Sequence, residues 1–316
     1  MKNLSTEIRD IARKLLDDNR VDLVIGFERG SLPLRSTPCF IRQGKGAGRL
    51  VWNASCENNL ARFLPKRAEK IGIVAKGCDI CSIIGLIQEG QITREQVFII
   101  GIPCSGMIDR RKVEAKVDGK DILEAEERDK EVILKGYDFE LSVSKDELLH
   151  NSCQTCSHKN PVIYDALVGD KIDGDGNVDQ YEDITEFEAL SSEERWQSFT
   201  SEVSQCIRCY ACRNACPLCY CQECFVDSSQ PQWIGKTLNP SDRAIFHMVR
   251  AFHTAGRCVD CGACERACPM GINLRKLTRK IKKDVEEFFH YQAGVSLEDV
   301  PPLVTFNPDD PQEFIR

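Results

Sequence analysis

Two cysteine runs in the second half of the sequence share one spacing. The first run begins at Cys206 and ends at Cys216, and the second begins at Cys258 and ends at Cys268; a proline follows each. Both read C-x2-C-x2-C-x3-C-P. Three thiolates at this spacing can hold three corners of a [4Fe-4S] cluster, whereas the fourth cysteine reaches the neighbouring cluster. The pattern therefore predicts two [4Fe-4S] clusters with crossed ligands.

The crossed pattern assigns four ligands to each cluster. One cluster takes Cys206, Cys209, Cys212 and Cys268, and the other takes Cys258, Cys261, Cys264 and Cys216. Zinc sites or disulfides are the alternatives. Zinc usually takes two C-x2-C pairs, however, not two complete four-cysteine runs that each end in proline. We therefore interpret both runs as cluster ligands.

Three further cysteines follow the first run at Cys219, Cys221 and Cys224. They exceed what two clusters need, and no simple C-x2-C pair includes all three. One interpretation is a fourth cluster that a distant cysteine completes, such as Cys39 or Cys56. The other is a structural or redox role for the thiols, and the sequence favours neither.

A second group of cysteines lies on a βαβ pattern in the first half of the chain. Apolar strands at 71–75 and 97–102 flank a helix at 77–87, which together have the size of one βαβ unit with a parallel strand pair. Ligands of such sheets bind beyond the carboxyl ends of the strands. Cys78 and Cys81 follow the first strand at a helix N-terminus, which favours thiolate, and Cys104 follows the second strand. All three are placed for metal binding or redox work; for any one alone, a buried structural cysteine is the simpler interpretation.

Cys153 and Cys156 form a C-x2-C pair at a turn, which is half of a tetrahedral site. The other half would come from Cys78, Cys81 or Cys104. We favour a third iron–sulfur cluster over zinc because two clusters are already predicted downstream. A thiol pair without metal is the remaining alternative. His158 is close enough to be a fallback ligand, but an ordinary surface residue is the simpler interpretation.

The composition excludes several classes of protein. With 42% hydrophobic and 29% charged residues, the 316-residue chain has the composition of a globular protein and the length for two domains. Its 18 cysteines, many at metal-ligand spacings, indicate a reducing compartment rather than a disulfide scaffold. We find neither an apolar signal core nor a run of about eighteen apolar residues, and so expect a cytoplasmic protein without a transmembrane segment. The net charge of −7 argues against nucleic acid as the main partner.

Other elements are predicted around the cysteines. A strand at 21–25 is expected to pair with a returning strand at 50–52, and helices are expected at 183–200, from a cap at Ser241 onward, and at 274–288. Three parts follow. They are an α/β domain with a mixed or parallel sheet at 1–184, an α-helical two-cluster ferredoxin domain at 185–295 and an extended C-terminal tail at 296–316. The tail, rich in proline, is either a strap onto another subunit or disordered.

Two family resemblances cover most of the chain. The cysteine runs with their surrounding helices resemble the α-helical ferredoxins of succinate dehydrogenase iron–sulfur subunits and heterodisulfide reductase small subunits. Gly101-Ile-Pro-Cys104, and Cys153-Gln-Thr-Cys156 followed by Ala166-Leu-Val-Gly-Asp170, resemble the beta subunits of coenzyme F-420-reducing hydrogenases and formate dehydrogenases. The second resemblance implies a [4Fe-4S] cluster on Cys78, Cys104, Cys153 and Cys156, with Cys81 as the alternate for Cys78. It also implies FAD, for which no binding residue is matched by motif.

These observations predict an iron–sulfur electron-transfer subunit of a hydrogenase, formate dehydrogenase or heterodisulfide reductase type of complex. Several [4Fe-4S] clusters would relay single electrons between the other subunits of that redox complex. One alternative is an FAD-containing subunit that itself reduces or oxidises a soluble carrier, a deazaflavin or a nicotinamide. Another is a mainly structural assembly subunit.

Overall fold

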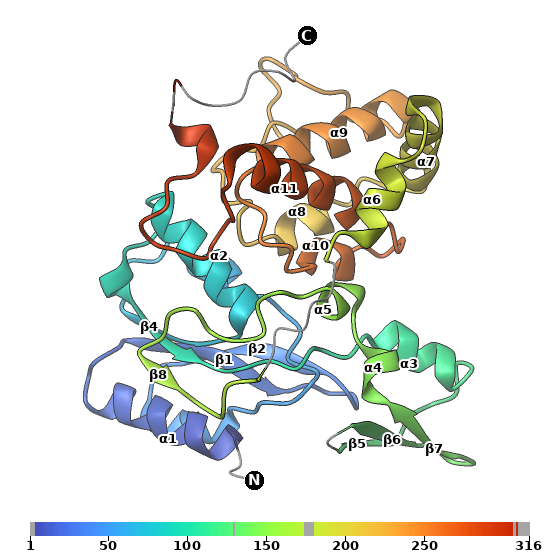
Figure 1. The fold of residues 1–316 in the computed structure, drawn as a ribbon. Helices are drawn as coiled ribbons and strands as arrows, with labels where there is room; N and C mark the ends of the chain where they lie inside the picture. Colours follow the sequence, from blue (N-terminus) through green and yellow to red (C-terminus); the bar gives the residue numbers. More distant parts are fainter. Residues whose placement is uncertain (1–3, 129, 174–179, 306–307, 309–316) are drawn as a thin grey trace. The chain divides into compact units, whose positions relative to one another are not determined.

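The computed structural model describes residues 4–128, 130–173, 180–305 and 308 (Figure 1). The chain divides into two compact units. The first, which we call the α/β unit, comprises residues 1–80 and 92–178, and the second, the helical unit, comprises residues 81–91 and 179–316. Because residues 81–91 group with the later part of the chain, neither unit is one continuous segment of sequence. The three predicted domain ranges remain a proposal.

A five-stranded mixed sheet forms the centre of the α/β unit. The strand order is β2-β1-β3-β4-β8. All neighbours are parallel except β2, which runs antiparallel to β1 at the sheet edge. The strands are β1 (Leu23–Arg29), β2 (Ser36–Ile41), β3 (Ile71–Ala75), β4 (Val97–Gly101) and β8 (Ala166–Leu167). The mixed α/β class predicted for this part is confirmed.

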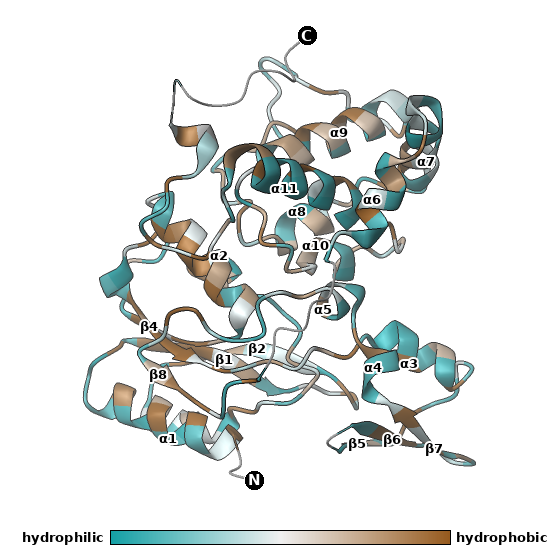
Figure 2. Ribbon diagram, in the orientation of Figure 1, coloured by the Kyte–Doolittle hydropathy of each residue, from teal (hydrophilic) through white to brown (hydrophobic). Residues whose placement is uncertain are grey.

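Helix α1 (Leu4–Asp17) covers one face of this sheet (Figure 1). Its residues Ile8, Ala12 and Leu15 recur at helical spacing and are buried in one cluster with Val24 and Ile100 of the strands. Burial of each large apolar side chain contributes about 1.5–3 kcal/mol. Strand β4 appears as a hydrophobic segment in Figure 2, and every residue of β3 is buried, as expected for strands buried on both faces.

The βαβ prediction is confirmed. Strand β3 pairs in parallel with β4, from Ile71 opposite Val97 to Ala75 opposite Gly101. Helix α2 (Gly77–Gln88) connects them, followed by the short 3-10 helix η3 (Arg94–Gln96). The first turn of α2 belongs to the α/β unit and the rest to the helical unit.

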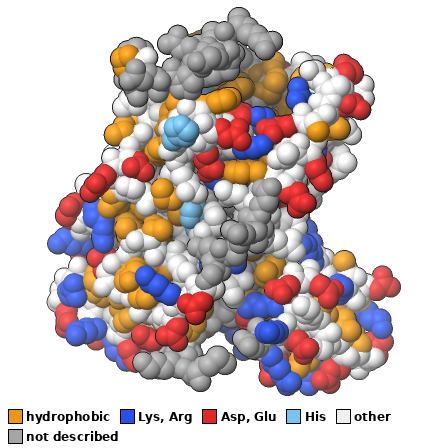
Figure 3. All heavy atoms as spheres, in the orientation of Figure 1, with side chains coloured by type: hydrophobic (Ala, Val, Ile, Leu, Met, Phe, Trp, Pro, Cys, Tyr) orange, Lys and Arg blue, Asp and Glu red, His pale blue; other side chains and the backbone are white. Residues whose placement is uncertain are grey.

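A three-stranded antiparallel sheet with short helices completes the α/β unit. Figure 3 shows many charged side chains over this part of the surface. Its apolar residues Val113, Val132, Leu134 and Val143 are buried in a cluster of their own. The elements are α3 (Arg110–Lys116), β5 (Glu124–Glu127), β6 (Glu131–Lys135), β7 (Glu140–Ser144), α4 (Lys145–Leu148) and α5 (Asn151–Gln154).

The helical unit contains no strand among its described residues. Besides the end of α2, its helices are α6 (Glu182–Glu188), α7 (Ser192–Ser204), α8 (Ala211–Ala215), α9 (Pro240–His253), α10 (Ala263–Arg266), α11 (Arg275–Phe289) and the 3-10 helix η4 (Pro302–Val304). The predicted helical class of this part is confirmed. No helix that the structure describes is long and apolar enough to span a membrane.

Three local predictions are wrong. The strand that returns beside β1 is β2, because Val24 to Arg29 pair with residues 36–41; Leu50 makes only an isolated bridge to Glu28. Helix α9 begins after Asn239, with Pro240 in its first turn, so Ser241 is not the cap. The helix expected at 183–200 is two helices, α6 and α7, with the capping box of Ser191 and Glu194 starting the second. Residues 306–307 and 309–316 of the predicted C-terminal tail lie outside the described residues.

Candidate iron–sulfur sites

The two cysteine runs fold into the same local structure. In the first run, Arg208 and Tyr210 flank the second cysteine with φ values of 53° and 59°; in the second run, Asp260 and Gly262 occupy the same positions at 52° and 71°. Left-handed backbone is uncommon for residues other than glycine and is typically found where function requires it. A short helix, α8 or α10, then carries the third cysteine of each run. The same cysteine spacing therefore gives two loops with the same backbone conformation.

The fourth cysteine of each run lies with the other run, as the spacing predicts. Cys268 is buried in one cluster with Cys206 and Cys212. Burial raises the pKa of the Cys206 thiol, and the nearby Cys268 and Cys209 raise it further. Conversely, Cys216 lies close enough to Cys258, Cys261 and Cys264 to raise the pKa of each, although burial is the largest cause for all three.

The thiols are not taken up by disulfides. None of the 18 cysteines is disulfide-bonded. Among the described residues, no three Cys, His, Asp or Glu side chains converge closely enough to hold one metal ion. A cubane separates its four thiolates because each binds a different iron, whereas zinc gathers its ligands around one centre. Since burial raises the pKa values of Cys258, Cys261 and Cys264, iron binding must displace protons from these thiols.

Backbone and charged groups surround the sulfurs. In the first run, the Arg208 amide donates to Cys206 Sγ at 3.3 Å. In the second run, Arg275 of α11 forms two hydrogen bonds to the Asp260 carboxylate, at 2.7 and 2.6 Å. Although α11 is one of the most hydrophilic helices in Figure 2, its residues Arg275, Arg279 and Lys282 are buried. Hydrogen bonds and charges near the sulfurs are the features by which a protein sets cluster potentials.

The α/β unit brings a third set of cysteines together. Cys78 begins α2, Cys104 follows β4, and Cys153 and Cys156 lie in and after α5. Burial raises the pKa of Cys104 to about 12, with Cys153 and Cys156 near enough to raise it too. Backbone amides donate to two of these sulfurs: that of Met107 to Cys153 and that of His158 to Cys156, each at 3.4 Å.

A close backbone contact supports this third grouping. A Cβ added at Gly77 would overlap the carbonyl oxygen of His158. The glycine therefore allows the loop that follows Cys156 to pack directly against the helix turn that carries Cys78. The four residues fit a thiolate-bound cluster in donor type and in placement. Cys81, in contrast, is buried in an apolar cluster of the helical unit with Val259 and Val285.

A buried ion pair beside this third group was not predicted. Lys76, directly after β3, places its ammonium 3.0 Å from the Asp79 carboxylate, with the two side chains 3% and 0% exposed. The ammonium also donates to the Asn58 carbonyl at 2.7 Å. Burial lowers the pKa of the ammonium, but the nearby charges of Asp79, Cys78 and Cys104 raise it by more. The sequence feature that could have indicated Lys76 is its position directly after a strand and before two cysteines.

Two of the surplus cysteines, Cys219 and Cys224, lie near enough for the charge of Cys224 to raise the pKa of Cys219. Cys219 forms a thiol hydrogen bond with Cys216, which lowers the pKa of Cys219 and raises that of Cys216. Cys224 forms a hydrogen bond with Arg213, and Cys221 is exposed. Cys39 and Cys56 are buried in the α/β unit, where burial raises both pKa values to about 11.

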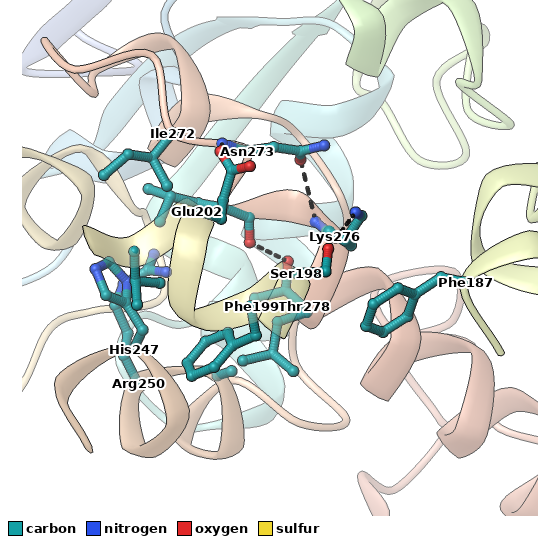
Figure 4. A pocket seen from close by; sticks show the side chains of 14 residues that line it. Phe187, Ser198, Phe199, Glu202, His247, Arg250, Ile272, Asn273, Lys276 and Thr278 are labelled. Atoms are coloured by element: carbon teal, nitrogen blue, oxygen red, sulfur yellow. Dashed lines mark hydrogen bonds between the residues drawn. The ribbon is translucent and has the colours of Figure 1, made fainter. Parts of the chain in front are cut away.

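Each unit contains a cavity. In the helical unit, residues of α7, α9 and α11 line a cavity of about 50 Å³; His247 and Arg250 of α9 lie side by side in its wall (Figure 4). In the α/β unit, a cavity of about 590 Å³ lies beyond the carboxyl end of β1, lined by Arg29, Arg35 and Lys135 among other residues.

The chain is similar to known iron–sulfur proteins. Residues 202–272 match the model of the 4Fe-4S dicluster domain, which spans both cysteine runs. The chain is 26% identical to the F420-dependent formate dehydrogenase subunit beta of Methanocaldococcus jannaschii, over 92% of this chain and 91% of that protein. It is 24% identical to F420-dependent formate dehydrogenase 1 subunit beta of Methanococcus maripaludis, over 92% and 90%.

A solved structure, the xenon-derivatised F420-reducing [NiFe] hydrogenase complex of Methanosarcina barkeri, is similar to part of the chain. The alignment covers 48% of this chain and 59% of that one, at 14% identity and a TM-score of 0.38. The resemblance to formate dehydrogenase beta subunits joined to a helical ferredoxin is thus confirmed by the sequence relatives and the domain match, and [4Fe-4S] binding with it.

Proposed function

We propose that this chain is the iron–sulfur electron-transfer subunit of a multi-subunit oxidoreductase of the formate dehydrogenase or hydrogenase type. One observation carries the proposal. The crossed cysteine sets lie inside a 4Fe-4S dicluster domain, in a chain that is similar along 92% of its length to formate dehydrogenase beta subunits. The protein's role is to hold, insulate and orient redox centres, while the electron chemistry belongs to those centres.

The chain's residues divide this work. Two clusters would be held by the crossed sets, Cys206, Cys209, Cys212 and Cys268, and Cys258, Cys261, Cys264 and Cys216. A third would be held by Cys78, Cys104, Cys153 and Cys156. When bound, such clusters accept and release single electrons. Buried apolar neighbours such as Phe246 and Ile272 pack around Cys206, Cys212 and Cys268 of the first set, whereas Cys209 is exposed. The Arg208 amide donates to Cys206 Sγ.

The relatives' names suggest the partners. Both are subunits of F420-dependent formate dehydrogenases, so we propose a catalytic partner subunit and a deazaflavin as soluble carrier. The 18 cysteines without a disulfide support a cytoplasmic location, because reducing compartments preserve thiols. The surplus thiols Cys219 and Cys224, each hydrogen-bonded within the helical unit, support the structural or redox role rather than a fourth cluster.

The direct test of this role is electron acceptance by the anaerobically purified chain together with its co-purified partner. Formate, hydrogen or reduced deazaflavin is added while the visible absorbance of the clusters is followed. At least one of these donors is expected to bleach the absorbance as the clusters are reduced. Bleaching by dithionite but by none of the three donors would contradict an electron-transfer role in this class of complex.

A second candidate is a subunit that also carries FAD and itself reduces the carrier. The cavity of about 590 Å³ in the α/β unit favours it, because cofactor sites typically have volumes of about 300–1,000 Å³. Arg29 and Arg35 could meet a diphosphate there, although Glu126 and Glu127 also line the cavity. Flavin released by denaturing the purified protein would support this candidate; iron and sulfide without flavin would eliminate it.

A further inference from the structure

Helix α9 carries a buried cation on its inner face. Its residues Phe246, His247, Arg250 and Ala251 are buried. Arg250 lies in the last turn with an exposed fraction of 6%. A guanidinium remains charged at any pH that a folded protein meets. A full positive charge is therefore held inside the helical unit.

This cation differs from the other buried cations of the unit. Arg208 lies 3.6 Å from Asp242, Arg275 lies 2.6 Å from Asp260, and Lys282 pairs with Glu286. Arg279 pairs with Asp183. No carboxylate pairs with Arg250 among the described residues, and its Nε has no hydrogen-bond partner there. Burial of an uncompensated charge costs several kcal/mol, so another negative group must compensate it.

Cysteine sulfurs supply that negative charge. Arg250 Nη2 donates to the Cys212 carbonyl at 3.3 Å, and its side chain is also hydrogen-bonded to the Cys264 thiol. The charges of Cys264, Cys216, Cys212 and Cys219, the last of which belongs to neither set, raise the guanidinium pKa more than burial lowers it. Cys212 belongs to one crossed set, whereas Cys264 and Cys216 belong to the other.

The neighbouring imidazole adds no charge. Burial lowers the pKa of His247 to about 4, and the cations Arg250 and Arg208 lower it further. His247 is therefore neutral near pH 7, and Arg250 is the charged member of the pair seen in Figure 4.

We propose that Arg250 is the counter-charge shared by the two cluster sites of the helical unit, a positioning residue that sets the reduction potentials of both. The inference rests on the proposed cluster ligation. Reduction adds one negative charge to a site, so a fixed cation nearby favours the reduced form at each site. The same cation also weakens the repulsion between two reduced sites. Loss of the charge should lower both potentials together.

The test uses the full-length chain, purified anaerobically with its clusters, and potentiometric titration followed by electron paramagnetic resonance. Arg250→Met removes the charge and keeps an apolar stem. At least a tenfold shift of each site's equilibrium toward the oxidised form is expected, equivalent to about 59 mV for a one-electron couple. Arg250→Lys retains the charge and should restore both potentials most of the way to the native values.

Arg243→Met is the matched control on the same helix. Arg243 lies near Cys206 of one set only, so this change should move at most one potential. A change of one or neither potential in Arg250→Met, with the iron content intact, would overturn the proposal and leave the proposed function standing. Absence of iron from the native chain would overturn the proposed function itself.

Failure of Arg250→Met to take up iron is also informative. Normal iron content and near-native potentials in Arg250→Lys would then support a requirement for the charge. Loss of iron from both variants would show that the shape of arginine, not its charge, is needed, and would overturn the proposal.

Discussion

Cys268 is the residue that tests the crossed ligation most simply. Its thiol is buried with Cys206 and Cys212 of the other run, so Cys268→Ser should remove the cluster held by the first run. The iron content should fall by about four per chain, since one [4Fe-4S] centre is lost. Iron analysis and electron paramagnetic resonance measure this loss.

Cys221→Ser provides the control, because Cys221 is exposed and is assigned to neither crossed set. Its iron content should equal that of the native chain. If Cys268→Ser instead removes the signal that Cys258→Ser removes, each run holds its own cluster and the crossed assignment is wrong.

His247 gives the helical unit a pH-dependent stability. Its pKa is lowered from an ordinary value of 6.5 to about 4 by burial and by the facing cations Arg250 and Arg208; Glu202 and Lys276 line the same cavity. The unfolded chain therefore takes up a proton between pH 6.5 and pH 4 while the folded chain does not. The contribution of neutral His247 to the free energy of unfolding is therefore full above pH 6.5, and the free energy should fall by about 3 kcal/mol toward pH 4.

Denaturant unfolding of the anaerobic protein at several pH values measures the effect, with His247→Gln as the comparison. The variant should lose less stability than the native chain over this range. Equal pH dependence of the two proteins would show that His247 is not held neutral by the fold.

At the residue scale, cysteine spacing predicts which sulfurs come together, because the ligand pattern is local in sequence. The charges around them could not be predicted in this way. Arg250 lies between the two runs at a site that carries no motif, and only the packing of α9 places it beside Cys212. Lys76 had a partial signal, since it directly follows a buried strand.

At the element scale, the turn from β3 to α2 depends on the Lys76–Asp79 pair. The Asp79 carboxylate accepts the backbone amides of Lys76 and Leu60, at 3.1 and 3.2 Å, besides the Lys76 ammonium. Lys76→Met would leave this carboxylate buried without its cation. We expect a loss of about 3–5 kcal/mol in the free energy of unfolding.

Chemical denaturation measures this loss, and two variants serve as controls. Lys70→Met, on an exposed residue, should change stability by less than about 0.5 kcal/mol. Adding Asp79→Asn to Lys76→Met should recover part of the loss, because it removes the unpaired charge. An undiminished stability of Lys76→Met would show that the pair does not support the turn.

The βαβ unit could be predicted because its strands are continuously apolar and its helix follows at once. The partner of β1 could not, because β2 (Ser36–Ile41) contains Pro38 and mixes buried, half-buried and exposed residues. Such a pattern suits an edge strand, where proline is tolerated, whereas residues 50–52 only appeared more apolar. Helix α9 begins at Pro240 because proline suits the first helical turn. The sequence prediction instead took the neighbouring Ser241 as the cap.

At the scale of the whole molecule, the sequence predicts an α/β part and a helical part, and both classes are found. It could not predict that residues 81–91 join the helical unit. That assignment depends on contacts distant in sequence, such as the hydrogen bonds from the Gln88 amide to the carbonyls of Ser296 and Asp299, at 2.9 and 2.6 Å. Such pairings leave no periodic signal in either segment.

These contacts give α2 a role in holding the helical unit together. Gln88→Ala would remove both hydrogen bonds and should reduce stability by about 1–2 kcal/mol. Faster amide hydrogen exchange in residues 290–300 is also expected, since these carbonyls tie the segment to α2. Unchanged exchange in that segment would show that Gln88 does not anchor it.

The most direct test of the central claim is the iron and acid-labile sulfide content of the anaerobically purified chain. Two clusters in the helical unit and one in the α/β unit predict about twelve irons and about twelve sulfides per chain. About eight of each would remove the α/β cluster and leave the ferredoxin assignment intact. Zinc in place of iron, or iron without sulfide, would contradict the account of this chain as an iron–sulfur electron-transfer subunit.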